Sequence, residues 1–168
     1  MENLDVIYED NHIVVVVKPQ NVPSQADESG DLDMLSMVKA YVKEKYNKPG
    51  GAYIGLVHRL DRPTGGIMVF ARTSKAANRL SEQIKNGEFV KTYYCVTDGI
   101  PKESEGHLVN YLKKDDNIVK IVPMSETGAK RAETIYKVLE VEKNLALVKV
   151  NILTGRSHQI RVQMANIG

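Results

Sequence analysis

The sequence predicts an α+β fold with a mixed, mostly antiparallel β-sheet and flanking helices. Runs rich in β-branched and aromatic residues outnumber the segments with helical spacing, and short polar turns join most of these runs as hairpins. Strands do not alternate regularly with helices, which argues against a repeated βαβ unit. A length of 168 residues fits one domain with a sizeable core.

The first half of the chain is expected to hold three strands and two helices. The strands are expected at residues 6–8, 13–17 and 67–71. Apolar residues at helical spacing predict a helix over 33–48, and Pro49 and Gly50 would end it. Ser74 is expected to cap a second helix, because Gly87 then stands where a C-terminal glycine belongs.

The second half is expected to be rich in strands and to end in a short helix. Its strands are expected at residues 89–97, 107–113, 118–122, 132–141 and 145–153. The Asp-Asp-Asn turn at 115–117 is a hairpin signal between two of them. A break at Gly155 precedes a helix over 157–166, whose core-facing side would carry Ile160 and Met164.

Composition limits the classes of protein that the chain can represent. Hydrophobic residues make up 42% and charged residues 26%, which is ordinary for a soluble globular protein. No window approaches 18 uncharged apolar residues, and the acidic N-terminus lacks the basic start of a signal peptide, so we expect a cytoplasmic protein without a membrane span. Cys95 is the only cysteine, which excludes an internal disulfide and a cysteine-based zinc site.

The small net charge of +2 conceals an uneven distribution. Residues 59–91 carry seven Lys or Arg against three Asp or Glu, and residues 120–168 carry eight against four. Local positive charge of this kind suits a polyanionic partner such as a nucleic acid. On charge alone, lysines scattered over a solvated surface explain the pattern equally well.

Three segments carry residue types suited to chemistry. In residues 58–66, Asp61 stands between two arginines that favour its ionised form, and an ionised carboxylate can act as a nucleophile. Residues 91–94 form part of a predicted strand, and residues 154–161 combine a glycine turn with a polar helix start. Taken alone, Asp61 fits a structural salt bridge better than a catalytic group.

Together the segments resemble the signature motifs of the RluA family of pseudouridine synthases. The opening strands, with Tyr8 to His12 and Val17 to Pro19, resemble the family's N-terminal strand pair. The matching motifs are His58-Arg59-Leu60-Asp61-Arg62-Pro63-Thr64-Gly65-Gly66, Lys91-Thr92-Tyr93 and Thr154-Gly155-Arg156-Ser157-His158-Gln159-Ile160-Arg161. The resemblance covers essentially the whole chain with the motifs in order, and it implies the pseudouridine synthase fold.

The resemblance also implies an activity, namely isomerisation of a uridine in ribosomal or transfer RNA to pseudouridine. Asp61 matches the family's essential aspartate, which attacks the sugar or assists loss of its proton while the base detaches. Tyr93 matches the tyrosine that stacks on the base and helps to remove the carbon-5 proton. Arg161 matches the basic residue that pairs with the aspartate, and Arg59 the arginine that helps to extrude the nucleotide.

Four further residues are expected to contact RNA, and RNA is the only partner implied. They are His58, Arg62, Arg156 and His158. A structural salt bridge is the alternative for Arg62, and a metal site is the weaker alternative for the two histidines. The reaction is redox-neutral and implies no cofactor or metal, and no obligate protein partner or membrane contact is expected.

The match departs from the family pattern at three places. Gly65-Gly66 stands where Ser-Gly is usual, and Gln163 stands where the third motif usually has a histidine. Family members usually continue with further strands and a helix beyond Gly168. We therefore expect residues 1–168 to be a catalytic domain that lacks its C-terminal elements and has no separate N-terminal RNA-binding domain.

Two alternatives from other classes stay open at this point. The chain is an RNA-binding fragment without turnover if truncation has removed activity. A hydrolase of small molecules with an aspartate nucleophile would explain Asp61, but it would explain neither Arg59 nor the basic blocks.

Overall fold

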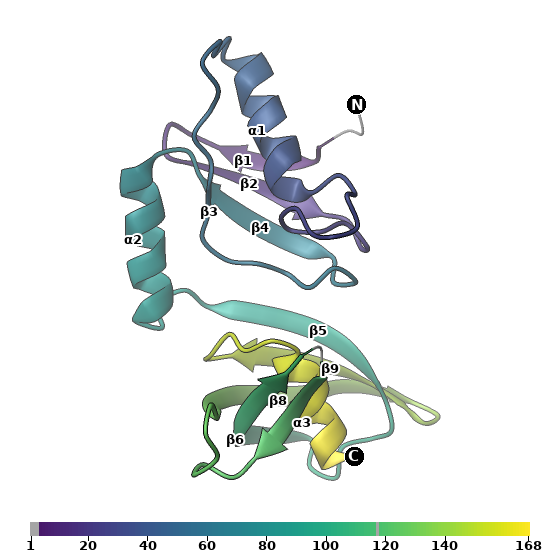
Figure 1. Cartoon of the computed structure of the whole chain (residues 1–168). Coiled ribbons are helices and arrows are strands. Elements are labelled where there is room, and N and C mark those ends of the chain that lie inside the picture. Colours follow the sequence, from purple (N-terminus) through teal and green to yellow (C-terminus); the bar gives the residue numbers. More distant parts are fainter. Residues whose placement is uncertain (1–3, 117) are drawn as a thin grey trace. The chain divides into compact units, whose positions relative to one another are not determined.

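The computed structural model describes residues 4–116 and 118–168 of the chain. The chain divides into two compact units, with the boundary between Asn86 and Gly87 (Figure 1). Each unit has its own antiparallel sheet, and every strand pair in the described residues is antiparallel. The predicted α+β class with a mostly antiparallel arrangement is confirmed. That the two units make one catalytic domain stays a prediction.

The first unit has a four-stranded sheet and two helices. Its strands are β1 (Val6–Glu9), β2 (Ile13–Lys18), β3 (Gly55–Leu56) and β4 (Gly66–Ala71), and its helices are α1 (Met34–Lys45) and α2 (Ser74–Lys85). The strand order is β1-β2-β4-β3. The predicted hairpin, the strand near 67–71 and both helices are confirmed. The two-residue strand β3 was not predicted.

Alternation along β2 builds the core of the first unit. Val14 pairs with Phe70 and Val16 pairs with Met68, and all four side chains are fully buried. Helix α1 lies across this face (Figure 1), and its residues Met34, Val38 and Val42 are also buried. Lys18 continues the same buried face at the end of β2, where it pairs with Gly66.

Side-chain caps define where the two helices of the first unit begin. Asp33 accepts a hydrogen bond from the Ser36 amide, which confirms the predicted start of α1. The prediction that Ser74 caps α2 is wrong, because Thr73 is the extended residue before the helix and accepts from the Ala76 amide at 3.1 Å. Gly87 follows the helix with φ +76°, as its predicted place after the helix requires.

The second unit is a five-stranded sheet with one helix. It contains β5 (Lys91–Asp98), β6 (Glu105–Asp115), β7 (Ile118–Val122), β8 (Lys130–Glu142), β9 (Leu145–Ile152) and α3 (Gln159–Ile167), and the strand order is β5-β9-β8-β6-β7. All five predicted strands and the helix are confirmed. Of the predicted turn 115–117, Asn117 lies outside the described residues.

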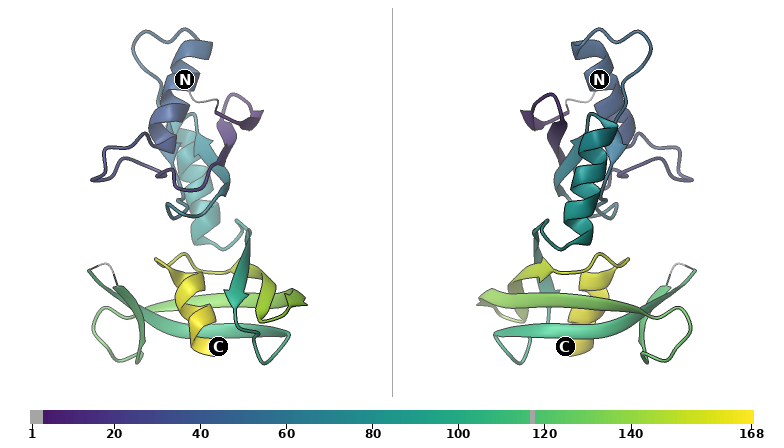
Figure 2. Two further views of the ribbon diagram at one scale, coloured as in Figure 1. Left: turned by 90° about the vertical axis from the view of Figure 1, so that its right-hand side faces the viewer. Right: turned by 90° about the vertical axis from the view of Figure 1, so that its left-hand side faces the viewer.

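Helix α3 covers one face of the second sheet, which we call the inner face (Figures 1 and 2). Met164 of the helix belongs to a buried cluster with inward-facing residues of β8 and β9, namely Tyr136, Ala146, Val148, Val150 and Ile152. Ile160 packs partly buried against the same cluster, so the predicted core-facing side of the helix is confirmed. Arg161 is exposed.

Candidate active site

The Asp61 loop is anchored to the first unit through Leu60. The Leu60 side chain is buried, with 8% of its surface exposed. The buried Ser24 hydroxyl donates to the Leu60 carbonyl at 2.7 Å and accepts from the Leu60 amide at 3.1 Å. Both backbone groups of Leu60 are therefore fixed by one side chain, which holds the neighbouring Arg59 and Asp61 at the surface.

Lys18 supports the same loop from inside the unit. Its ammonium group donates to the carbonyl oxygens of Pro19 at 2.9 Å, Val22 at 2.6 Å and Arg62 at 3.0 Å. Burial lowers the pKa of Lys18, while the negative charge of Asp61 acts in the opposite direction. The buried Lys18 ammonium group thus lies close to the Asp61 carboxylate. It also binds the backbone carbonyl of Arg62, the residue that follows Asp61.

The side chains of Arg59 and Asp61 are both exposed. Neither makes a hydrogen bond or salt bridge with another residue that the structure describes. The Asp61 carbonyl accepts from the Thr64 amide at 2.9 Å, which closes the turn after the motif. The loop therefore has a fixed backbone and presents a carboxylate and a guanidinium group to solvent.

Arg62 turns toward an acidic loop of its own unit. Its guanidinium donates to the Ser29 hydroxyl at 2.9 Å and forms salt bridges with Asp31 and, at 3.5 Å, with Asp27. The hydrogen bond from Arg62 is the main reason that the pKa of Asp31 lies below its usual value. These contacts match the structural alternative for Arg62, and its RNA contact stays a prediction.

His58 joins the Asp61 loop to strand β4. Its Nε2 atom accepts a hydrogen bond from the Val69 amide at 3.0 Å, which requires that this nitrogen carry no proton. The ring thereby supplies an acceptor to the backbone of β4. An additional contact of His58 with RNA stays a prediction.

Tyr93 lies on the inner face of the second sheet. Exposure alternates along β5, so that Lys91, Tyr93 and Cys95 share this face, as predicted. Tyr93 pairs with Val150 and packs half-buried against the core cluster of the second unit. Pairing of the edge strand β5 with β9 therefore fixes the position of the tyrosine.

The third motif is held by a chain of side-chain hydrogen bonds. Thr154 accepts from the Glu133 amide at 2.9 Å and donates to the Gln159 side chain at 2.7 Å. The Gln159 carbonyl oxygen also accepts from the Arg156 amide at 3.0 Å. His158 precedes the helix in the left-handed conformation, with φ +51°. The helix consequently begins at Gln159, two residues later than predicted.

The two arginines of this motif differ in their surroundings. Arg156 is exposed and donates through Nε to the Arg131 carbonyl at 2.9 Å. The Arg161 side chain makes no hydrogen bond or salt bridge within the described part of the chain. Arg161 is therefore available for an external anion, whereas Arg156 is partly committed to the turn.

Gln163, which replaces the histidine usual in the motif, points into the second unit. It is fully buried. Its carbonyl oxygen accepts from the Thr134 hydroxyl at 2.7 Å, and its amide donates to the Asn110 side chain at 2.8 Å. The side chain serves the packing of α3 on the sheet, so this departure from the family pattern does not alter an exposed group.

The predicted site residues fall into two local groups. His58, Arg59, Asp61 and Arg62 belong to the first unit, and Tyr93, Arg156, His158 and Arg161 belong to the second. Sequence reasoning did not assign roles to the supporting residues Lys18, Ser24 and Gln159. Lys18 had a signal that could have revealed it, because it continues the buried alternation of Val14 and Val16.

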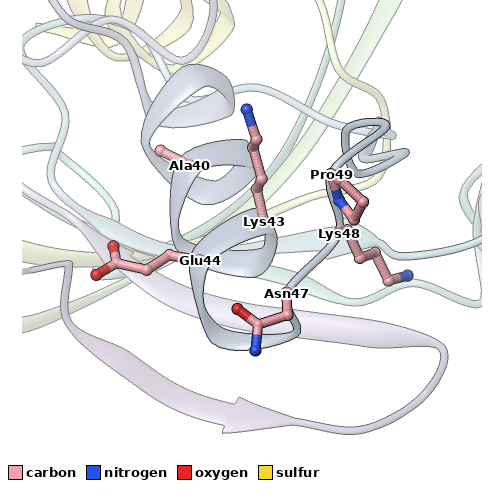
Figure 3. Close-up of a pocket in the computed structure, with 6 residues that line it drawn as sticks. All are labelled: Ala40, Lys43, Glu44, Asn47, Lys48 and Pro49. Atoms are coloured by element: carbon pink, nitrogen blue, oxygen red, sulfur yellow. The ribbon is translucent and has the colours of Figure 1, made fainter.

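A hollow of about 590 Å³ lies at the C-terminal end of α1, and none of the predicted site residues lines it. It is lined by Ala40, Lys43, Glu44, Asn47, Lys48 and Pro49. In Figure 3 the charged ends of Lys43, Glu44 and Lys48 point away from one another. The hollow therefore does not assemble a set of converging polar groups.

Comparisons with known proteins show which family the chain belongs to. The family described as RNA pseudouridylate synthase matches residues 12–166. The chain is 33% identical to a ribosomal large subunit pseudouridine synthase D of Zymomonas mobilis, over 98% of this chain and 53% of that protein. It is 32% identical to a mitochondrial tRNA pseudouridine(32) synthase of Saccharomyces cerevisiae, over 98% of this chain and 35% of that protein.

A solved structure shares the same fold. The human protein RNA Pseudouridylate Synthase Domain Containing 4 matches with a TM-score of 0.82 at 26% identity, over 96% of this chain and 64% of that one. The chain thus belongs to the RNA pseudouridylate synthase family, and the predicted resemblance to its RluA members is confirmed. It spans about half the length of the bacterial relative.

Among the described residues, no helix combines the length and the apolar character that a membrane span requires.

Proposed function

We propose that this chain isomerises a uridine in ribosomal or transfer RNA to pseudouridine. The observation that carries the proposal is the family match over residues 12–166, which includes all three motifs. The relatives named above are called synthases for ribosomal RNA and transfer RNA. An exposed carboxylate on a fixed loop, at Asp61, suits the chemistry that those names describe.

The proposed role of Asp61 is to act on the sugar of the target nucleotide. The carboxylate attacks the sugar or assists loss of its proton while the bond between the sugar and nitrogen 1 of the base breaks. The base then rotates and rejoins the sugar through carbon 5, and this step releases the carboxylate from the sugar or returns the proton that the sugar lost. Carbon 5 loses its proton and nitrogen 1 gains one, so the product is an isomer and the reaction needs no oxidant or reductant.

Tyr93, Arg59 and Arg161 would handle the nucleotide around this step. Extruding a base from a stacked helix costs a few kcal/mol, and the planar guanidinium of Arg59 can fill the vacated stack. The Tyr93 ring can hold the detached uracil, since stacking on an aromatic side chain contributes about 1–3 kcal/mol per base. Arg161 can pair with a carboxylate or phosphate, because its side chain is exposed.

Release of tritium from RNA labelled at carbon 5 of uridine tests the proposal. We expect Asp61→Asn to reduce release by at least about 10²-fold, since it removes the reacting carboxylate. Binding of the same RNA, followed by fluorescence anisotropy, should stay nearly unchanged. Glu28→Gln is the matched control, because Glu28 is another exposed acid of the first unit.

The possible outcomes separate the alternatives. A fully active Asp61→Asn variant would refute the role of Asp61. RNA binding without tritium release by the unmodified chain would overturn the synthase proposal and support the RNA-binding alternative.

A further inference from the structure

A basic cleft of about 240 Å³ lies in the second unit; Arg156, which was expected to contact RNA, lines it, and Asp61, Tyr93, Arg59 and Arg161 do not. Two of its walls are the hairpin formed by β6 and β7 and the turn before α3. The residues that line it are Leu112, Lys114, Val119, Gly128, Lys130, Gly155, Arg156 and Ser157. Three of them are cationic, and none of these described lining residues is acidic.

Strand register places the two lysines on the inner face of the sheet. Lys130 pairs with the buried Leu112, and Lys114 follows Leu112 by two residues on the same face. Lys114 in turn pairs with Val119 of β7. The inner face therefore carries lysines where it reaches the hairpin. The turn at 155–157 forms the opposite wall of the cleft.

No salt bridge among the described residues involves a cation of the cleft. Neither Lys114 nor Lys130 forms a salt bridge with a residue that the structure describes. Glu126, an acid near the hairpin, is paired with Lys113 at 2.7 Å, and alternation puts Lys113 on the opposite face. Within the described residues, the Arg156 side chain donates through Nε to a backbone carbonyl, and its terminal nitrogens can bind an external acceptor.

Lys91 connects the cleft with the strand of Tyr93. A Cβ atom on Gly155 would lie 3.8 Å from the Lys91 Nζ atom, so Lys91 lies beside the same turn. Burial lowers the pKa of Lys91, and the charge of Arg156 adds to that shift. Tyr93 lies two residues beyond Lys91 on the same face. Cations consequently continue along the inner face from β5 to the hairpin.

We propose that this cleft binds phosphate groups of the RNA strand that flanks the target nucleotide. The inference rests on the proposed function, because it takes RNA as the ligand. Lysine binds phosphate as a point charge and arginine binds it through paired hydrogen bonds. The described lining residues include no aromatic side chain on which a base could stack. The cleft therefore recognises the backbone, without preference for sequence.

The register also indicates how far from the target these phosphates lie. Tyr93 lies in the same cross-strand row as Gly106, through Val150 and Tyr136. From Gly106 to Lys114 along β6 the chain advances eight residues, or about 27 Å at the usual rise of a strand. Lys114 thus lies far along the sheet from the row of Tyr93, whereas Gly155 and Arg156 line the cleft beside Lys91, so the cleft would contact phosphates of the RNA strand that leads away from the target.

The test compares two double variants that remove the same charge from different faces of one sheet. Lys114→Ala with Lys130→Ala removes the cleft lysines, and Lys120→Ala with Lys137→Ala removes two exposed lysines of the outer face. The probe is a fluorescein-labelled RNA of a substrate sequence, measured over a range of salt concentrations. We expect the cleft variant to bind about tenfold more weakly and to have a log–log salt slope shallower by about 1.4, which corresponds to two lost phosphate contacts. The control variant should change neither quantity appreciably.

Further measurements make each outcome decisive. Lys114→Arg with Lys130→Arg should restore both affinity and slope, and equal melting temperatures would show that all variants fold. Equal binding by the cleft and control variants would overturn the cleft inference while tritium release by the unmodified chain upholds the proposed function. An unmodified chain that neither binds RNA nor releases tritium would overturn the proposed function itself.

Discussion

Lys18 is a buried charge whose surroundings account for its presence. An ammonium group loses its hydration on burial, a cost that is acceptable only when other polar groups replace the water. Here three carbonyl oxygens accept from Nζ, and one of them belongs to Arg62, next to Asp61. The charge of Asp61 also favours the cation. Lys18 therefore joins the end of β2 to the loop that carries the candidate carboxylate.

Replacement of Lys18 by methionine tests this positioning role. Methionine is unbranched like lysine but one atom shorter, and it leaves the carbonyls of Pro19, Val22 and Arg62 without their donor. We expect the free energy of unfolding, measured with guanidinium chloride, to fall by about 1–3 kcal/mol. Lys39→Met, on the exposed side of α1, is the control and should change it little.

Kinetics add a measurement that a purely structural role would not affect. If Lys18 positions the loop, Lys18→Met should lower kcat for tritium release at temperatures where the variant is folded, while RNA affinity is retained. Equal unfolding free energies for the two methionine variants would contradict the support that we assign to Lys18.

Gln163 shows what a single departure from a family pattern can mean. The sequence shows that Gln163 cannot carry the charge that a histidine at this position could carry. The structure places this side chain inside the second unit, where Thr134 and Asn110 contact it. Burial and partners of this kind depend on how α3 packs on the sheet, so motif spacing could not reveal them.

At the scale of elements, local signals predicted most of the fold. The hairpin of β1 and β2 follows from alternation, and α1 follows from apolar spacing between Asp33 and a proline-glycine stop. The strand β3 has only two residues and carries no strand pattern of its own. Its position depends on pairing with β4. Gly55 also packs closely against α2, since a Cβ atom on this glycine would lie only 3.0 Å from the Ala77 side chain.

The contacts that hold the candidate site were beyond such local signals. Lys18 meets Arg62 across 44 residues of sequence, Ser24 meets Leu60 across 36, and Arg62 meets Asp31 across 31. Motifs identify the residues that act, because those residues lie together in short segments. The supporting residues come from other elements and become apparent only when the chain is folded.

The loop that contains Asp27, Ser29 and Asp31 provides a prediction that depends on pH. Arg62 is the main reason that the pKa of Asp31 is lowered in the folded chain. A carboxyl group with a lowered folded-state pKa stabilises the fold above its unfolded pKa of about 3.9, and this contribution is lost as the pH falls through the folded value. The contact of the loop with Arg62 should therefore persist at neutral pH and weaken in acid.

An NMR titration of the Asp31 carboxyl carbon measures this effect. We expect a midpoint below about 3.9 in the unmodified chain and a midpoint raised toward that value in Arg62→Gln, which removes the guanidinium. Lys85→Gln, at the end of α2, should leave the midpoint unchanged. The same midpoint in the unmodified chain and in Arg62→Gln would show that this salt bridge does not form in solution.

At the scale of the whole molecule, the structure refines the meaning of the charge distribution. The basic block over 120–168 does not form one continuous face of the second sheet. Alternation puts Lys120 and Lys137 on the outer face and Lys130 on the inner face. Basic side chains gather where elements distant in sequence meet, as at the cleft, and a count along the chain cannot show this.

Such local gathering predicts how the whole chain responds to salt. Each phosphate that the chain neutralises releases counterions, so the logarithm of affinity for single-stranded RNA falls by about 0.7 per contact for each unit of log salt. If Lys91 and the three cations of the cleft each neutralise one phosphate, the four contacts give a slope of about −3, or about sevenfold weaker binding for each doubling of salt. We expect a slope of this size in spite of the net charge of only +2.

A peptide nucleic acid of the same base sequence is the control ligand, because it keeps the bases but has no phosphates. It should bind weakly and with little dependence on salt. A flat response to salt with RNA would show that phosphate contacts do not account for binding, and the basic residues would then be ordinary solvated surface.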